Sequence, residues 1–132
     1  MPGGSSAPTS GRELEDAVFQ LARTLELEVL RGVIAGRRLW GAKRKIDLVL
    51  RDKTNQRTLG VECKYQRGPG SAEEKIPATI DDIRAWPIPG LVVFDGEGFT
   101  ENMRSYLVSS GRAVALEDLE PWLRLFFGLA LT

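Results

Sequence analysis

The sequence has no histidine and one cysteine among its 132 residues. A single cysteine cannot form a disulfide within the chain, so we expect Cys63 to be a small buried apolar residue. A thiol nucleophile is disfavoured because no histidine is present to act as its base. The same absence excludes nucleases that depend on histidine, and it disfavours a zinc site, since zinc sites in proteins are rich in histidine and cysteine.

Long apolar segments are also lacking. The C-terminal run from Trp122 to Leu131 is short and is interrupted by Arg124, so it does not predict a membrane span. Residues 1–10 have no apolar core and are interpreted as a flexible tail rather than a signal peptide. The sequence therefore predicts a single domain over residues 11–132 and a cytoplasmic location.

Charge is balanced overall but unevenly distributed. The chain has 18 basic and 18 acidic residues, yet the segment from Arg31 to Arg67 holds eleven Lys or Arg against three acids. This local surplus predicts attraction to a polyanion such as DNA, and the alternative is a solvated basic face with no partner. The candidate phosphate contacts are Arg37, Arg38, Lys43, Arg44, Lys45 and Arg67.

The segment from Leu59 to Gln66 has the pattern of a strand with one polar face. Because successive side chains point to opposite faces, Glu62, Lys64 and Gln66 would share one side. The Cα atoms of Glu62 and Lys64 would lie about 6.6 Å apart, so both groups could reach one phosphate. Asp47 could join them from a neighbouring strand. The opposite, core-facing side would carry Leu59, Val61, Cys63 and Tyr65.

Asp47 followed by Glu62-Cys63-Lys64 resembles the PD-(D/E)XK nuclease superfamily, which has the restriction-endonuclease-like fold. Ile46 stands where the proline of that motif is usually found. The resemblance implies an α/β fold, with a mixed sheet flanked by helices and an αβββαβ core. The order of predicted elements after Ser10 fits this architecture.

The resemblance also implies a site for one divalent cation, Mg²⁺ or Mn²⁺, above the phosphate to be cut. Asp47 and Glu62, with the backbone carbonyl of Cys63, would hold the cation. Lys64 would orient or deprotonate the attacking water and stabilise the charge that grows on phosphorus. The alternative is a surface ion pair between Glu62 and Lys64 without catalysis.

Two further acidic or polar side chains are candidates for the same site. Members of the superfamily often have a glutamate on the first helix that helps to hold a second metal or a water, and Glu15 is the candidate here. An ordinary surface acid is the alternative for Glu15. Gln66 could bond to a phosphate or to a water on the metal, and the alternative is a polar residue on an edge strand.

Periodicity and turn residues predict the order of the elements. Ser10 and Glu13 form a capping-box pattern at the start of the first helix. Pro77 indicates that the second helix either begins or bends there. The predicted elements are helix 11–26, strands 28–35, 46–50 and 58–66, a helix around 72–83, strand 91–94, turn 95–98, helix 99–109, strand 112–116 and helix 117–128.

The favoured function is a metal-dependent DNA endonuclease of the restriction, repair or Holliday-junction-resolving type. One site per chain implies a homodimer or two successive nicks if both strands are cut. The apolar C-terminal run would suit a dimer interface, although burial in the core explains most of it equally well. The alternatives are a non-catalytic subunit that binds nucleic acid or supports an assembly, and a nuclease that acts on RNA.

Overall fold

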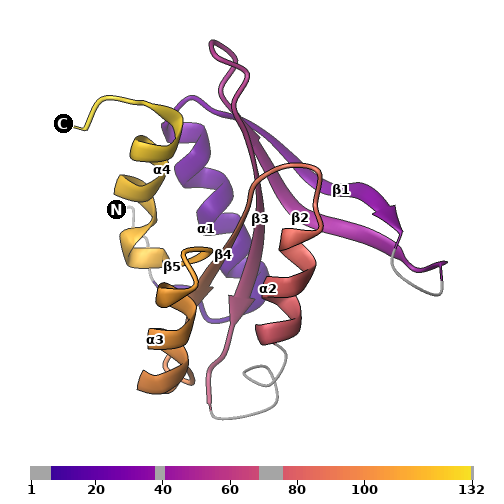
Figure 1. The fold of residues 1–132 in the computed structure, drawn as a ribbon. Helices are drawn as coiled ribbons and strands as arrows, with labels where there is room; N and C mark the ends of the chain where they lie inside the picture. The colour runs from indigo at the N-terminus through magenta and orange to yellow at the C-terminus, as the bar shows by residue number, and fades with distance from the viewer. Residues whose placement is uncertain (1–6, 38–40, 69–75, 132) are drawn as a thin grey trace.

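A five-stranded mixed sheet with helices on both faces forms the body of the molecule (Figure 1). The computed structural model describes residues 7–37, 41–68 and 76–131. In chain order the elements are α1 (Gly11–Thr24), β1 (Glu28–Arg37), β2 (Lys43–Arg51), β3 (Thr58–Tyr65), α2 (Ile76–Arg84), β4 (Gly90–Asp95), α3 (Glu101–Ser109), β5 (Ala113–Ala115), the 3₁₀ helix η3 (Leu116–Asp118) and α4 (Leu119–Phe127).

The strands lie in the order β1-β2-β3-β4-β5. The first three strands are antiparallel neighbours, whereas β4 runs parallel to β3 and β5 parallel to β4. The predicted three-stranded meander followed by a helix and a buried parallel strand is therefore confirmed. Strand β4 is apolar and buried up to Phe94, because helices cover it on both sides.

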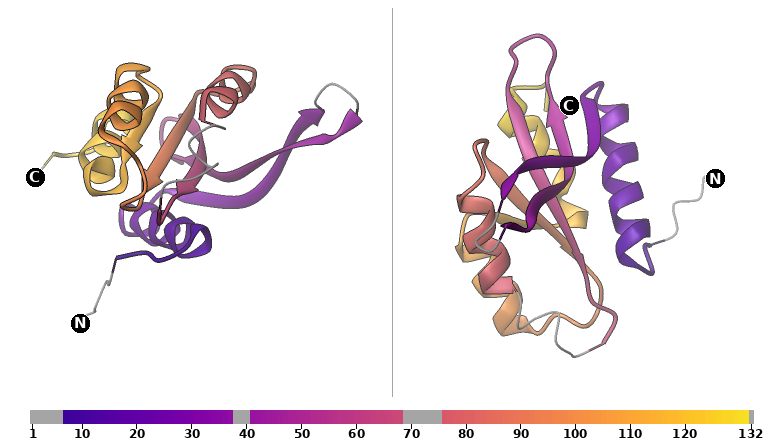
Figure 2. Two further views of the ribbon diagram at one scale, coloured as in Figure 1. Left: turned by 90° about the horizontal axis from the view of Figure 1, so that it is seen from below. Right: turned by 90° about the vertical axis from the view of Figure 1, so that its right-hand side faces the viewer.

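Each face of the sheet has its own apolar core. On one face α1 and α4 present stripes at helical spacing, and on the other α2 and α3 do so (Figures 1 and 2). None of the helices in the described part of the chain combines the length and apolarity that crossing a bilayer requires. The first core includes Leu14, Val18, Ala22, Leu119, Leu123 and Phe127, and the second includes Ile76, Ile80, Ile83, Trp86, Phe94 and Leu107.

The start of α1 is fixed by its cap. Ser10 Oγ accepts a hydrogen bond from the backbone N–H of Glu13 at 3.1 Å, as the capping pattern predicts. The Glu13 carboxylate accepts from the backbone N–H and the hydroxyl of Thr9, at 3.1 and 2.9 Å, rather than from Ser10. The helix ends at Thr24, two residues before the predicted end, and this cap sets which side of α1 carries Glu15.

The boundaries in the second half differ slightly from those predicted. Among the described residues α2 spans Ile76–Arg84, and Pro77 is the second of them. The capping pattern predicted for Ser71 and Glu74 lies outside the described residues. The predicted helix 117–128 is split into η3 and α4. Core burial accounts for much of its apolar run, but Leu125 is 69% exposed.

Two facing glycines fix β3 and β4 against the second core. Gly60 of β3 pairs with Gly90 of β4, and the indole of Trp86 lies across both. A Cβ atom at Gly60 would lie 2.7 Å from two ring carbons of Trp86, closer than such atoms can approach. The absence of a side chain at position 60 therefore lets Trp86 hold the strand that carries Glu62 and Lys64.

The β1–β2 hairpin projects away from the rest of the sheet (Figures 1 and 2). Its pairing continues to Arg37 and Lys43, whereas the pairing of β2 with β3 stops at Leu48 and Val61. The first half of β2 therefore leaves β3, and a gap opens in the sheet beside Asp47.

We expect Gly60→Ala to lower the free energy of unfolding by about 1–3 kcal/mol, because Trp86 must move to admit the methyl group. Thermal or urea unfolding would measure this loss. Gly11→Ala is the matched control, since no atom lies within 4 Å of a Cβ there and alanine favours a helix. Equal stability of the two variants would contradict the packing role of Gly60.

Candidate active site

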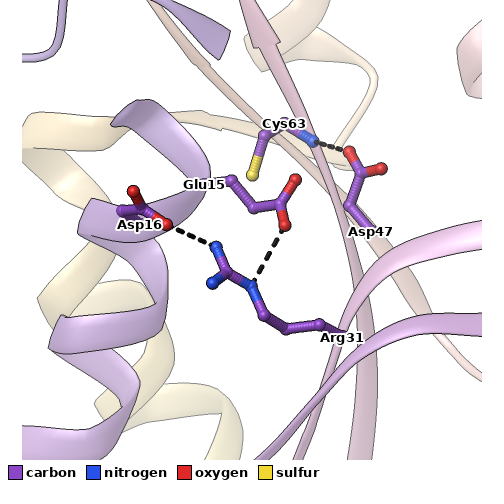
Figure 3. Close-up of polar contacts among 5 residues, drawn as sticks. All are labelled: Glu15, Asp16, Arg31, Asp47 and Cys63. Carbon is purple, nitrogen blue, oxygen red and sulfur yellow. Dashed lines mark hydrogen bonds and ion pairs between the residues drawn. The ribbon is translucent and has the colours of Figure 1, made fainter. Parts of the chain in front are cut away.

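Asp47 lies where β2 and β3 separate. Its Oδ2 accepts a hydrogen bond from the backbone N–H of Cys63 at 3.0 Å (Figure 3). The carboxylate thus replaces the carbonyl that a continued ladder would have offered to this N–H. The bond holds the carboxylate in the gap, next to Glu62.

Glu62 is the most buried acid of the predicted motif. Its side chain is 15% exposed, and Lys64 Nζ lies 3.8 Å from its Oε2. Its Oε1 is buried and has no hydrogen-bond partner among the described residues. Because a buried carboxylate oxygen without a partner is costly, this atom favours a proton or a cation as its ligand.

The pKa of Glu62 is raised to about 7, first by burial and next by the negative charge of Asp47, while the positive charge of Lys64 opposes the rise. The two carboxylates therefore resist being ionised together in the absence of a counter-charge. A divalent cation would remove this conflict, since it favours the ionised form of both acids.

The donor set fits an oxygen-seeking cation. Asp47 and Glu62 supply carboxylate oxygens, and the backbone carbonyl of Cys63 is the third candidate. Burial, reinforced by the surrounding acids, raises the pKa of the Cys63 thiol above its usual range, so the protonated thiol is favoured and the backbone carbonyl is the better donor of this residue. In the part of the chain that is described, no three Asp, Glu, Cys or His side chains are grouped closely enough to hold a metal. Glu15 is therefore not grouped with the other two acids around one ion.

Glu15, on α1, nevertheless lines a pocket together with Asp47. The pocket has a volume of about 250 Å³ and is lined by Glu15 and Asp47 together with Arg12, Arg31 and Lys45. Glu15 Oε1 lies 3.2 Å from Arg31 Nε, and Asp16 Oδ1 lies 2.6 Å from Arg31 Nη2 (Figure 3). The structure thus brings the helix acid beside Asp47, but with one oxygen already paired.

Gln66 was predicted to be the last residue of the strand, but it follows the end of β3. Strand β3 ends at Tyr65, and Gln66 is 5% exposed, with its Nε2 donating to the carbonyl of Gly98 at 2.8 Å. The backbone N–H of Gly98 also donates to the carbonyl of Gln66 at 2.8 Å. The alternative of an edge-strand residue is wrong, because β3 lies between β2 and β4. Gln66 connects the ends of two central strands.

The predicted phosphate contacts separate into different environments. Arg37 and Lys43 are paired and exposed on the hairpin, and Lys45 lines the pocket of Asp47. Arg44 faces α2 instead, where its Nε lies 3.2 Å from Asp82 Oδ1.

Arg67 lies away from the hairpin strands. Arg67 donates to the carbonyl of Thr9 at 3.3 Å and borders a separate pocket of about 490 Å³. Arg38 lies outside the described residues.

Arg12 and Arg31 were not singled out from the sequence, yet both line the pocket of Glu15 and Asp47. Arg12 precedes Glu15 by three residues, so helical spacing alone places it on the same side of α1. Arg31 lies on the same side of β1 as Val29, which packs in the core beneath α1. Helical spacing and strand alternation could therefore have placed each arginine on its own element. They do not show that α1 packs against β1, which brings the two arginines into one pocket.

Comparison with known proteins gives a match along most of the chain. The family described as "PD-(D/E)XK nuclease superfamily domain" matches residues 7–124. No curated protein matches the sequence.

Two solved structures are similar to this chain. AF1548, a protein of unknown function, is similar with a TM-score of 0.53 and 17% identity over 76% of this chain and 55% of that one. A repair endonuclease from Pyrococcus abyssi has a TM-score of 0.46 and 15% identity over 83% of this chain and 47% of that one. This chain spans about half the length of these two proteins, and the likeness to AF1548 concerns the fold alone.

The buried charge of Glu62 predicts that Glu62→Gln stabilises the metal-free protein. The pKa of a glutamate is ordinarily 4.5, and that of folded Glu62 is about 7. As the pH rises between these values, folded Glu62 keeps a proton that the unfolded chain releases, so stability falls. In EDTA at pH 8 the free energy of unfolding of the glutamine variant should therefore exceed that of the parent protein by about 1–3 kcal/mol.

Thermal unfolding at pH 4 and pH 8 would measure this difference, which should disappear at the lower pH. Glu117→Gln removes the same charge from an exposed position and serves as the control. A Glu62→Gln variant that is less stable than the parent protein at pH 8 would contradict the buried, unpartnered state of this carboxylate.

Proposed function

The chain belongs to the PD-(D/E)XK nuclease superfamily, and on that premise we propose that it is a divalent-metal-dependent DNA endonuclease that hydrolyses phosphodiester bonds. The observation that carries the proposal is the buried, unpartnered Oε1 of Glu62, with Asp47 and Lys64 beside it. A surface ion pair would leave both carboxylate oxygens in water. This carboxylate is withdrawn from water and lacks the ligand that its burial requires.

Asp47 and Glu62, with the Cys63 carbonyl, would hold Mg²⁺ or Mn²⁺. When bound, such a cation neutralises charge on the phosphate and activates water for attack. Asp47 is already oriented for this role, because the N–H of Cys63 fixes one of its oxygens. Geometry fixed before the substrate arrives lowers the entropy cost of reaching the transition state.

Lys64 has two tasks in this proposal. Its ammonium lies 3.8 Å from Glu62, so it can move from the carboxylate to a phosphate without leaving the site. There it would orient the attacking water and stabilise the negative charge that develops on phosphorus. Gln66 would act indirectly, since its bond to Gly98 fixes the end of the strand that carries Lys64.

The projecting hairpin would hold the DNA backbone. Arg37, Lys43 and Lys45 lie along it, and Lys45 also reaches the pocket of Asp47. Arg12 on α1 faces the same pocket from the other side. Phosphate contacts of this kind position DNA without reading its sequence, which suits a restriction, repair or junction-resolving enzyme equally. Cutting both strands of a duplex would require a homodimer or two nicks.

A non-catalytic subunit that binds nucleic acid is the second candidate. It is favoured by one observation, namely that no group of three metal-ligating side chains occurs among the described residues. One property distinguishes the two candidate functions. An endonuclease must cut a substrate in Mg²⁺ or Mn²⁺, whereas a binding subunit must leave it intact.

We expect the parent protein to cut at least one member of a labelled panel of duplex, single-stranded, flap and four-way-junction DNA and RNA in Mg²⁺ or Mn²⁺. Asp47→Ala and Glu62→Ala should abolish this cutting, and Lys64→Ala should slow it by about 10²-fold or more. Gel assays under single-turnover conditions would measure these rates. Preference for the junction would identify a resolvase.

Glu117→Ala is the control for these acids, since it removes an exposed carboxylate far from the motif in the sequence. Full activity of Asp47→Ala or Glu62→Ala would overturn the site. If the folded parent protein binds DNA but leaves every substrate intact with both cations, the second candidate is correct.

The combined variant Arg37→Ala, Lys43→Ala, Lys45→Ala should bind DNA with a weaker salt dependence. If each side chain meets one phosphate, the slope of log K against log [salt] becomes shallower by about three units. Fluorescence anisotropy with a duplex in EDTA would measure this slope. A control that replaces the exposed Arg23, Lys53 and Arg84 removes the same charge, and an equal effect in both variants would place the DNA elsewhere.

A further inference from the structure

Arg31 is held more firmly than a typical surface arginine. Its guanidinium forms ion pairs with Glu15 and Asp16 on α1, at 3.2 and 2.6 Å, and its Cζ lies 4.9 Å from the ring centroid of Phe19. The guanidinium thus lies among two carboxylates and an aromatic ring of one helix. These contacts fix a positive charge at the wall of the pocket that contains Asp47.

Glu15 could serve the proposed reaction in two ways. It could hold a second cation, or it could orient the water that attacks the phosphate. Its Oε1 is paired with Arg31, and Oε2 is the oxygen left for either task (Figure 3). In the described segments neither Glu15 nor Asp16 belongs to a group of three metal-ligating side chains.

The charge of Arg31 distinguishes between these tasks. A guanidinium remains ionised at any pH at which the protein is folded, so its charge cannot be removed to admit a cation. A divalent ion on Glu15 would lie within a few ångströms of that charge and would have to displace it from both acids. Arg12, Arg31 and Lys45 line the pocket of Asp47, but among the described residues none of them forms an ion pair with it, and Glu62 has only the looser pair with Lys64 at 3.8 Å. The cation is therefore favoured at Asp47 and Glu62 and disfavoured at Glu15.

We propose that Arg31 is a positioning residue whose fixed charge occupies the place of a second divalent cation. The site therefore takes one cation. Glu15, held by Arg31 through Oε1, orients water through Oε2. The inference rests on the proposed function. It predicts that removal of the Arg31 charge creates a second cation site from Glu15 and Asp16.

The test counts Mn²⁺ ions bound per chain by electron paramagnetic resonance of the free ion, without DNA. We expect one ion for the parent protein and two for Arg31→Ala. The double variant Arg31→Ala, Glu15→Gln should return to one, because the new site loses its main ligand. Cleavage in Mg²⁺ by Arg31→Ala should fall about a hundredfold, since Glu15 is no longer held in place.

Arg51→Ala is the matched control. Arg51 also pairs with a glutamate across neighbouring elements, with its Nη2 2.8 Å from Glu28 Oε1, and its side chain is 44% exposed against 37% for Arg31. It lies at the other end of the hairpin strands from Lys45. This variant should bind one Mn²⁺ and cut DNA at the rate of the parent protein. An effect seen only in Arg31→Ala would then be specific to Arg31 and not a general result of removing an arginine ion pair.

Two Mn²⁺ ions on the parent protein, or one on Arg31→Ala, would overturn the inference. These outcomes differ from a failure of the proposed function. If the parent protein binds one Mn²⁺ and cuts DNA while Arg31→Ala also binds one, only the role of Arg31 is wrong. A parent protein that binds no Mn²⁺ and cuts nothing would remove the nuclease proposal itself, and the inference with it.

Discussion

The hydrogen bond from the Cys63 N–H to Asp47 is the contact on which the arrangement of the site depends. The backbone ladder between β2 and β3 stops at this point. The Cys63 N–H, which would otherwise lose its partner where the strands separate, is bonded to the Asp47 side chain instead. The hairpin can therefore diverge without leaving that central strand N–H unpaired. The same bond places an acid in the gap, so the break in the sheet and the proposed cation site have one origin.

At Glu62 the burial of the side chain opposes the negative charge of its carboxylate. The packing of Trp86 on Gly60 and Gly90 holds β3 firmly, and this brings Glu62 into a position where water is scarce. A protein selected only for stability would place an apolar residue there. Retaining an acid beside Asp47 costs stability in the metal-free protein, a cost that active sites commonly carry.

Local patterns in the sequence were sufficient for most of the fold. The cap at Ser10, the helical stripes and the alternation along β3 each depend on neighbours within a few residues, and each was predicted correctly. Gln66 was misplaced because alternation gives no sign that the strand stops at Tyr65. The pairing of Arg31 with Glu15 was not predicted, since it depends on how α1 lies against β1, which no local pattern specifies.

The proposed machinery is divided between two cores that share only the sheet. Glu15 and Arg31 depend on the packing beneath α1, whereas Glu62 and Lys64 depend on Trp86 and the packing beneath α2. Asp47 stands in the gap between them. Local loosening of one helix layer would thus uncouple the two halves of the site while the other layer stayed intact. The proposed activity would accordingly depend on the alignment between the layers, and it would be lost well before the chain unfolds.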